Sequence, residues 1–234
     1  MICAVHQPQY LPWPGYFAKL DAADLFVIYD DTQYKHDEWQ NRNRIKTANG
    51  AQWLTVPVHH HQADRICDVR IDSTLPWRRK HANALATNYA RAPFYAQYAD
   101  LIAALYQQDW PRLAELNTEC IVRLCSALGI TTRMVRSSDL DYTGKASDAL
   151  ISICQAVGAD AYLSGPGGRN YLNQDAFPAA GIDLLFHDFQ PPVYSQPYGE
   201  FVPYMSVIDL LLNVGPDSLD LIRSARTITA HDRR

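Results

Sequence analysis

The sequence lacks the features that would place it in a membrane or in a secreted fraction. It contains no run of about eighteen apolar residues, so no membrane-spanning helix is expected. The N-terminus has neither the basic segment nor the long apolar segment of a secretory signal peptide. The five cysteines include no CxxC pair, and their odd number predicts reduced thiols in a cytoplasmic protein.

Signatures of several common activities are also missing. The chain has no HExxH motif and no GxSxG elbow, which leaves metalloprotease and serine hydrolase activities without support. Consecutive strand residues point to opposite faces, so His59, His60 and His61 cannot easily bind one metal ion. We expect no metal site, and a metal hydrolase is the weakest alternative. A net charge of -4 argues against a broad basic surface for duplex nucleic acid.

What is present indicates one folded α/β domain spanning residues 1–234. Hydrophobic residues make up 47% of the chain, which is typical of a globular protein. Residues 2–5 and 25–29 are apolar runs on either side of a short helix at 16–23, a pattern that predicts a βαβ unit of a parallel sheet. Further strands are expected at residues 52–58, 66–71 (an edge strand), 131–137, 161–163 and 182–186.

Helical periodicity dominates the middle of the chain. Apolar residues three and four positions apart predict helices within residues 76–128, which we interpret as a helical insertion or cap on the α/β core. Two more helices are expected at 147–157 and 207–214, each followed by a glycine. Ser206 and Asp209 straddle the start of the last helix and are expected to cap it. Residues 227–234 are predicted to be loosely tethered.

Polar side chains follow the first two predicted strands where each strand ends. His6 and Gln7 come after the first strand, and Asp30 and Asp31 close the second. Ligands of open parallel sheets gather beyond these carboxyl ends, and histidine titrates near neutral pH. His6 is therefore a candidate acid or base, and the two acids could hold a hydroxyl, an amine or magnesium. A histidine bonded to a carbonyl and a solvated or capping acid pair are the alternative interpretations.

Amide, cationic and aromatic side chains are dense in residues 33–49, and they suit recognition of phosphates and hydroxyls. We name Gln33, Asn41 and Arg42 as candidate substrate contacts there, with Tyr10 in the preceding proline-rich loop. A plain surface loop is the alternative interpretation of this stretch.

A glycine-rich turn follows the strand predicted at 161–163. Glycines let backbone N–H groups approach an anion closely, and Arg169 adds a cation. The candidate substrate contacts of this turn are Ser164, Gly165, Gly168, Arg169 and Tyr171. The motif is neither GxGxxG nor a P-loop, so a tight strand-to-helix connection is the alternative.

Residues 77–81 (WRRKH) open the helical middle with three cations and a histidine. Such a cluster could clamp an anionic group such as a nucleotide diphosphate. A solvated helix face is the alternative interpretation.

The long stretch HQPQYLPWPGYFAKLDAADLFVIYDDTQYKHDEWQNRNRIK at residues 6–46 resembles the opening of WbqC-like proteins. The turn SGPGGRNYL and the tail F-x-x-x-x-S-x-x-D-x-L-x-N-x-G at 201–215 extend this resemblance over about residues 1–215. It implies an association with surface polysaccharide (O-antigen) biosynthesis, and it favours Lys80 and His81 within residues 77–81. A fainter likeness is to HIGH-type nucleotidyltransferases, although Tyr16 follows Gly15 where a second histidine would be expected.

Together these patterns predict an α/β fold with a parallel-sheet Rossmann-like core, HIGH-nucleotidyltransferase-like, and a helical insertion. The expected function is a transferase of cell-surface polysaccharide (O-antigen) or sugar-precursor biosynthesis that acts on an anionic nucleotide- or acyl-bearing small molecule. His6, Asp30 and Ser164 are expected to line one cavity, with Lys80, His81 and Arg169 neutralising charge. A non-catalytic ligand-binding or partner protein is the alternative. No cofactor is specified, and a homodimer is left open.

Overall fold

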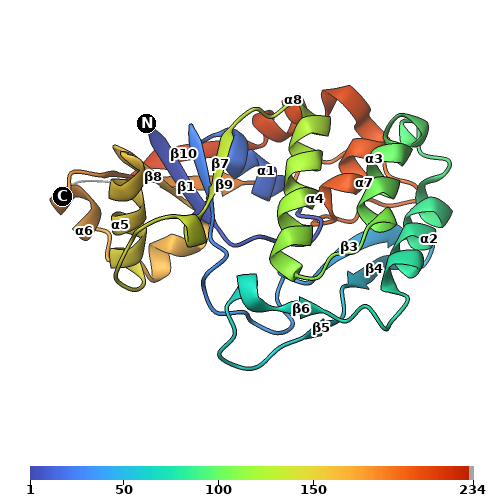
Figure 1. The fold of residues 1–234 in the computed structure, drawn as a ribbon. Helices are drawn as coiled ribbons and strands as arrows, with labels where there is room; N and C mark the ends of the chain where they lie inside the picture. Colours follow the sequence, from blue (N-terminus) through green and yellow to red (C-terminus); the bar gives the residue numbers. More distant parts are fainter. Residues whose placement is uncertain (232–234) are drawn as a thin grey trace.

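A single six-stranded sheet forms the centre of the molecule in the computed structural model, which describes residues 1–231 (Figure 1). The strand order is β10–β9–β8–β1–β2–β7, and every neighbouring pair is parallel except β9 with β10. This mixed α/β fold with a mostly parallel sheet confirms the predicted fold class at that level. The six strands are β1 (Ile2–His6), β2 (Leu25–Ile28), β7 (Arg133–Arg136), β8 (Ala161–Ser164), β9 (Asp183–Phe189) and β10 (Arg226–Ala230).

Helices cover both faces of this sheet. In Figure 1, α5 and α6 lie on one side, and α1, α4, α7 and α8 lie on the other. Because side chains alternate along a strand, β1 contributes to both cores: Cys3 and Val5 pack on the α5 side, and Ala4 packs on the α1 side. The helices are α1 (Pro14–Asp21), α2 (Trp77–Tyr89), α3 (Tyr95–Gln107), α4 (Leu113–Leu128), α5 (Ser147–Val157), α6 (Ala176–Ala179), α7 (Val207–Val214) and α8 (Ser218–Ser224).

The N-terminal strand–helix–strand unit forms as predicted. Helix α1 begins at Pro14, because a proline fits the first helical turn, where its missing N–H is not needed. All of its residues from Pro14 to Leu20 are buried, including the charged Lys19. The pairing of Val5 with Val27 brings the carboxyl ends of β1 and β2 to the same edge of the sheet.

The helical middle also forms as predicted, as α2, α3 and α4. Pro93 and Pro111 lie in the two connections between these helices, where they do not interrupt helical hydrogen bonds. Gly129 ends α4 in a left-handed conformation with φ 78°. The three helices pack into the same hydrophobic cluster as α1 and α7.

The strands predicted at 52–58 and 66–71 form only in part, and both lie outside the central sheet. The strand expected at 52–58 is β4 (Gly50–Thr55), which pairs only with β3 (Arg42–Thr47) in a separate antiparallel hairpin. The edge strand expected at 66–71 is a turn of 3-10 helix, η1 (Ile66–Asp68), followed by β6 (Arg70–Ile71), which pairs with β5 (Val58–His59). Arginine–tryptophan stacking supports the hairpin, with the Arg42 guanidinium 4.6 Å from the Trp53 ring centroid.

The C-terminal segment was predicted to be loosely tethered, and the structure corrects this. Residues 226–230 form β10, which pairs with β9 through five registered positions from Arg226–Phe189 onward. Arg226 also forms a partly buried ion pair with Asp21 of α1, which ties the last strand to the first helix. Residues 232–234 of that prediction lie outside the described residues. None of the helices within residues 1–231 combines the length and apolar character that crossing a membrane requires.

Candidate functional site

The chain adds strands on one side of β1 and then switches to the other side. The chain first adds β2 and then β7 on one side of β1, and it then returns to place β8 and β9 on the other side. In open parallel sheets the connections diverge at such a switch point, which leaves a crevice for ligands beyond the carboxyl ends. His6 is the last residue of β1 and Ser164 is the last of β8, so both lie at this crevice.

A cavity of about 580 Å³ opens at the carboxyl ends of β1, β2 and β8, beside the start of α5. Its wall combines aromatic rings, two amides, one cation and one imidazole, and it contains no carboxylate within the described residues. Such a mixture suits a planar or hydroxyl-rich anionic ligand. The polar and aromatic lining residues are His6, Gln7, Tyr29, Thr32, Gln33, Lys35, Tyr162 and Tyr171.

His6, the last residue of β1, lines this cavity at the edge of the sheet, and its imidazole is neutral. Its ring lies on Tyr16 with centroids 4.8 Å apart, and its Nδ1 is enclosed without a hydrogen-bond partner. Burial, followed by the nearby Lys19 and His187, holds the pKa of His6 well below its usual value. A neutral imidazole can accept a proton from a substrate hydroxyl or donate one hydrogen bond to it.

Gln7 and Gln33 also line the cavity, each with one side of its amide held by the protein. Gln40 donates to Gln7 Oε1 at 2.8 Å, and Gln33 Nε2 donates to the Gln62 carbonyl at 2.6 Å. The remaining NH₂ of Gln7 and carbonyl oxygen of Gln33 have no partner among the described residues and can face a ligand. Both side chains are therefore pre-oriented.

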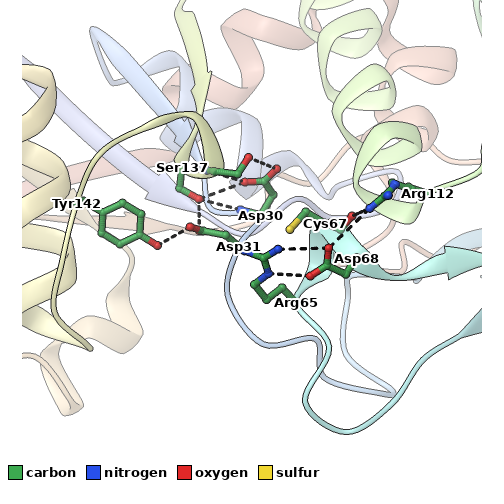
Figure 2. A network of polar contacts seen from close by, with 9 residues as sticks. Asp30, Asp31, Arg65, Cys67, Asp68, Arg112, Ser137 and Tyr142 are labelled. Atoms are coloured by element: carbon green, nitrogen blue, oxygen red, sulfur yellow. Dashed lines mark hydrogen bonds and ion pairs between the residues drawn. The ribbon is translucent and has the colours of Figure 1, made fainter.

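Asp30 and Asp31 do not line the cavity. Figure 2 shows both carboxylates turned toward the loop after β7, and Asp30, 1% exposed, accepts from Ser138 N at 3.1 Å and Ser138 Oγ at 3.0 Å. Asp31 accepts from Ser137 Oγ and from Tyr142 Oη, the latter at 2.8 Å. The acid pair thus fastens the β7 loop to the end of β2. The ion pairs of Arg65 and Arg112 with Asp68 lie in the adjoining loop (Figure 2).

The glycine-rich turn is tightly packed around Ser164, whose hydroxyl donates to the Gly165 carbonyl at 3.1 Å. A side chain on Gly168 would come within 2.0 Å of Ser164 Oγ, so only glycine fits there without rearrangement. Arg169 forms a two-pronged ion pair with Asp188, at 3.0 and 2.7 Å. Of the three residues expected in one cavity, only His6 lines it: the Ser164 hydroxyl faces its own turn, as the Asp30 carboxylate faces the β7 loop.

Tyr10 and His81 meet in a separate buried cluster against the helical middle. Tyr10 Oη hydrogen-bonds with His81 Nδ1 at 2.9 Å and with Tyr106 Oη at 2.8 Å. Burial lowers the pKa of His81 to about 4, so this imidazole is neutral and fully engaged. Lys80 is exposed on α2, and the hollow of about 660 Å³ beside α2 is lined by Arg78 and Arg79 instead.

Asn41 and Arg42 serve the β3–β4 hairpin. Asn41 Nδ2 donates to the Val56 carbonyl at 3.0 Å, and Arg42 pairs with Asp37 at 2.8 Å. Neither residue lines the switch-point cavity. In residues 1–231 no group of three or more His, Cys, Asp or Glu side chains is placed to hold a metal ion.

Two basic residues next to His6 escaped the sequence analysis. Lys19 of α1 and His187 of β9 both lie close enough to His6 to lower its pKa. The available signals were local: a lysine among the buried residues of α1, and a buried histidine directly after the apolar residues 184–186 of β9. Neither signal indicates that Lys19 and His187 lie near His6.

Comparison with known proteins bears on the whole chain. The profile of the WbqC-like protein family matches residues 7–221, which confirms the resemblance found in the sequence motifs. The chain is 39% identical over 229 residues to a Mycobacterium tuberculosis protein named "Uncharacterized protein Rv1507c", covering 95% of this chain and 98% of that relative. A search of the solved structures finds no significant match.

Proposed function

We propose that this chain, which belongs to the WbqC-like protein family, is a transferase that acts on an anionic nucleotide- or acyl-bearing small molecule. The observation that carries this proposal is the polar and aromatic cavity at the switch point of the sheet, with neutral His6 among its lining residues. The pathway, cell-surface polysaccharide (O-antigen) or sugar-precursor biosynthesis, is proposed from the resemblance to WbqC-like proteins.

The strand order supports a nucleotide-bearing ligand. Numbered along the chain, the parallel strands β7–β2–β1–β8–β9 have the order 3-2-1-4-5, which is the order of Rossmann-type folds that bind nucleotides at the switch point. We therefore propose a Rossmann-like core. A HIGH-nucleotidyltransferase-like arrangement is the finer proposal, supported by a histidine at the end of β1, directly before the loop to α1, and by the packing of Tyr16 on His6.

The side chains divide the chemistry between them. Tyr29 and Tyr171 offer ring faces to a base or a sugar, and the amides of Gln7 and Gln33 suit hydroxyl groups. Tyr162 is 2% exposed and stacks on Phe177, so it supports the cavity wall. In the transfer step, His6 takes the proton from the attacking acceptor hydroxyl or amine. The donor group then bonds to the acceptor, and the donor's anionic portion leaves with the electron pair of the broken bond.

A protein that binds the same ligand without turnover is the second candidate function. The observation in its favour is that Asp30, expected to take part in catalysis, is saturated by hydrogen bonds to the β7 loop. Within the described residues the cavity wall therefore has His6 as its only imidazole and no carboxylate to assist it.

Location and assembly belong to the proposal as well. All five cysteines are free thiols, which suits a reducing cytoplasm. We also include a homodimer in the proposal. Fractionation of cells and light scattering of the purified chain test these two points.

The proposed function is tested by a ligand screen followed by a turnover assay. Nucleotides, nucleotide sugars and acyl donors are screened by native mass spectrometry, and binding of the best ligand is measured by calorimetry. Tyr171→Ala should weaken binding about tenfold, since stacking of one ring is worth roughly 1–3 kcal/mol. Tyr171 is 65% exposed, so folding should be unaffected; Tyr198→Ala, 46% exposed and outside the cavity, is the matched control.

Turnover then separates the two candidate functions. A transferase should consume the ligand when an acceptor is present, and His6→Gln should slow that reaction at saturating ligand by roughly 10²–10⁴-fold. Binding without turnover would favour the second function. Equal loss of affinity in Tyr171→Ala and Tyr198→Ala would contradict the assignment of the cavity.

A further inference from the structure

Three basic side chains from three separate elements gather on the α1 side of the switch point. They are His6 at the end of β1, His187 in β9 and Lys19 in α1. His187 and Lys19 both lower the pKa of His6, and Lys19 also lowers that of His187, which agrees with the register of the strands. His187 is 3% exposed and Lys19 is 5% exposed.

The register of the sheet places the two histidines on the same face. Ala4 of β1 pairs with Leu163 of β8, and Leu163 pairs with Leu185 of β9. His6, residue 165 and His187 each come two residues after one of these paired positions. They therefore lie side by side across the sheet. Because side chains alternate, all three positions point to the face that α1 covers.

The position between the two histidines is a glycine. Gly165 has an extended backbone with φ -73° and ψ 170°, a conformation open to any residue. A side chain built on it would meet no other atom within 4 Å. The sheet therefore leaves open space between His6 and His187, and both His6 and Gly165 are partly exposed at the carboxyl edge, where a ligand group could enter.

The polar groups around this space are not satisfied by the protein. Nδ1 of His6 and Nε2 of His187 are enclosed and have no hydrogen-bond partner. The ammonium of Lys19 donates to the Val5 carbonyl at 2.8 Å, and it forms no ion pair within residues 1–231. Buried charges are ordinarily paired, so a buried cation beside two imidazoles that each keep one unpartnered nitrogen is complementary to an anion.

Electrostatics agrees with this geometry. Burial lowers the pKa of Lys19 to about 8 and that of His187 to about 4. At neutral pH the cluster therefore holds one positive charge and two neutral imidazoles, each of which can offer one N–H donor. Asp188, the nearest acid in sequence, is taken up by Arg169.

We propose that His6, His187 and Lys19 form a binding site for a phosphoryl group, which occupies the space that Gly165 leaves at the switch point. This inference rests on the proposed function and deepens it, because it identifies which part of the substrate is held there. Lysine provides the point charge typical of phosphate sites, and the two imidazoles fix the orientation of the phosphoryl oxygens. The rest of the substrate then extends into the cavity lined by Tyr162 and Tyr171.

The test uses inorganic phosphate as the probe and the full chain as the protein. Histidine ring signals are followed in two-dimensional ¹H–¹⁵N spectra during titration, at constant ionic strength kept with chloride. Phosphate should shift the His6 and His187 signals saturably and leave those of His81 and His59 in place. Gly165→Val should weaken this binding at least tenfold, because the new side chain fills the space without straining the backbone.

Gly167→Ala is the matched control, since a side chain there also meets no atom within 4 Å but does not lie between the histidines. It should bind phosphate as the wild type does. His187→Gln gives a second variant, and a loss of binding in both it and Gly165→Val, with unchanged thermal midpoints, supports the site. If His187→Gln unfolds, Gly165→Val decides the question, because it removes no buried side chain.

Two results would overturn the inference: phosphate that shifts neither histidine at saturating concentration, or Gly165→Val binding as tightly as Gly167→Ala. These outcomes are distinct from failure of the proposed function. A protein that binds phosphate between the histidines but turns over no donor has the site and lacks the transferase activity. A protein that turns over a donor with undiminished affinity in Gly165→Val has the activity and lacks this site.

Discussion

Two buried polar clusters in this molecule differ in whether the protein satisfies them. In α7, Asp209 is fully buried. Its carboxylate accepts hydrogen bonds from Tyr89 Oη at 2.6 Å, Tyr194 Oη at 2.7 Å and Gln196 Nε2 at 2.8 Å. At the switch point, the basic cluster of His6, His187 and Lys19 has enclosed nitrogens with no partner. The first cluster is complete without a ligand, and the second is not.

This difference separates groups that build the fold from groups available to a ligand. Buried polar atoms in folded proteins are nearly always hydrogen-bonded, so unpartnered ones require an explanation. The Asp209 network joins α7 to α2 and to the loop at residues 194–202, far apart in the sequence. The basic cluster joins nothing by hydrogen bonds except Lys19 to Val5, which points to a role in binding.

The largest expected effect is loss of the satisfied cluster. Asp209→Ala should lower the free energy of unfolding by about 3–5 kcal/mol, since it leaves buried hydroxyl and amide donors without an acceptor. Urea denaturation followed by circular dichroism measures the change. Asp217→Ala, a carboxylate in an exposed turn, is the control and should stay within about 0.5 kcal/mol of the wild type. A small loss in Asp209→Ala would break the distinction between the two clusters.

A smaller effect is expected from acid, through His81. Its folded pKa of about 4 lies below the usual value of 6.5, mainly because of burial, and Tyr10, Tyr106 and Lys80 are the titratable groups around it. The unfolded chain therefore takes up a proton that the folded chain does not. The contribution of neutral His81 to the free energy of unfolding is fully present above pH 6.5. It is lost as the pH falls toward 4, by about 1.4 kcal/mol per pH unit.

His81→Gln should remove this contribution, so the variant should lose less stability than the wild type between pH 6 and pH 4.5. Urea denaturation at both pH values measures the difference. His6→Ala provides the comparison at pH 7, where its thermal midpoint should stay within a few degrees, because no hydrogen bond is lost. Identical acid sensitivity in wild type and His81→Gln would show that His81 is not held neutral by the fold.

The sequence predicts those parts of the fold whose determining residues are contiguous in the chain. The strand–helix–strand start was predictable because its apolar runs and prolines are contiguous. The β3–β4 hairpin was not, since Arg42–Thr47 is mostly polar and its strand is held by distant partners. For example, Asn43 donates to the Leu11 carbonyl at 2.7 Å, and Lys46 N donates to Tyr89 Oη at 2.9 Å.

The candidate site shows the same limit. His6 could be singled out because it directly follows a buried strand, whereas Asp30 at the equivalent place turns to the β7 loop. That turn depends on Ser137 and Ser138, more than a hundred residues away. The placement of His6 and His187 on one face of the sheet depends on the register of three strands, which no pattern within one strand specifies.

The smallest expected effect on stability, and the one that most sharply separates the clusters, comes from Lys19→Met. Methionine keeps the length and the apolar stem of lysine, but removes a buried charge that has only the Val5 carbonyl as a partner. Replacing an uncompensated buried charge with an apolar side chain is often neutral or stabilising. We expect the free energy of unfolding at pH 7 to stay within about 1 kcal/mol of the wild type, with any change toward greater stability.

Affinity for inorganic phosphate should fall at least tenfold in the Lys19→Met variant. Urea denaturation and phosphate titration of one protein preparation measure both quantities. If Lys19→Met instead lowered the free energy of unfolding by several kcal/mol, Lys19 would belong with Asp209 among the groups that stabilise the fold. The unpartnered nitrogens of the basic cluster would then give no reason to assign it a binding role.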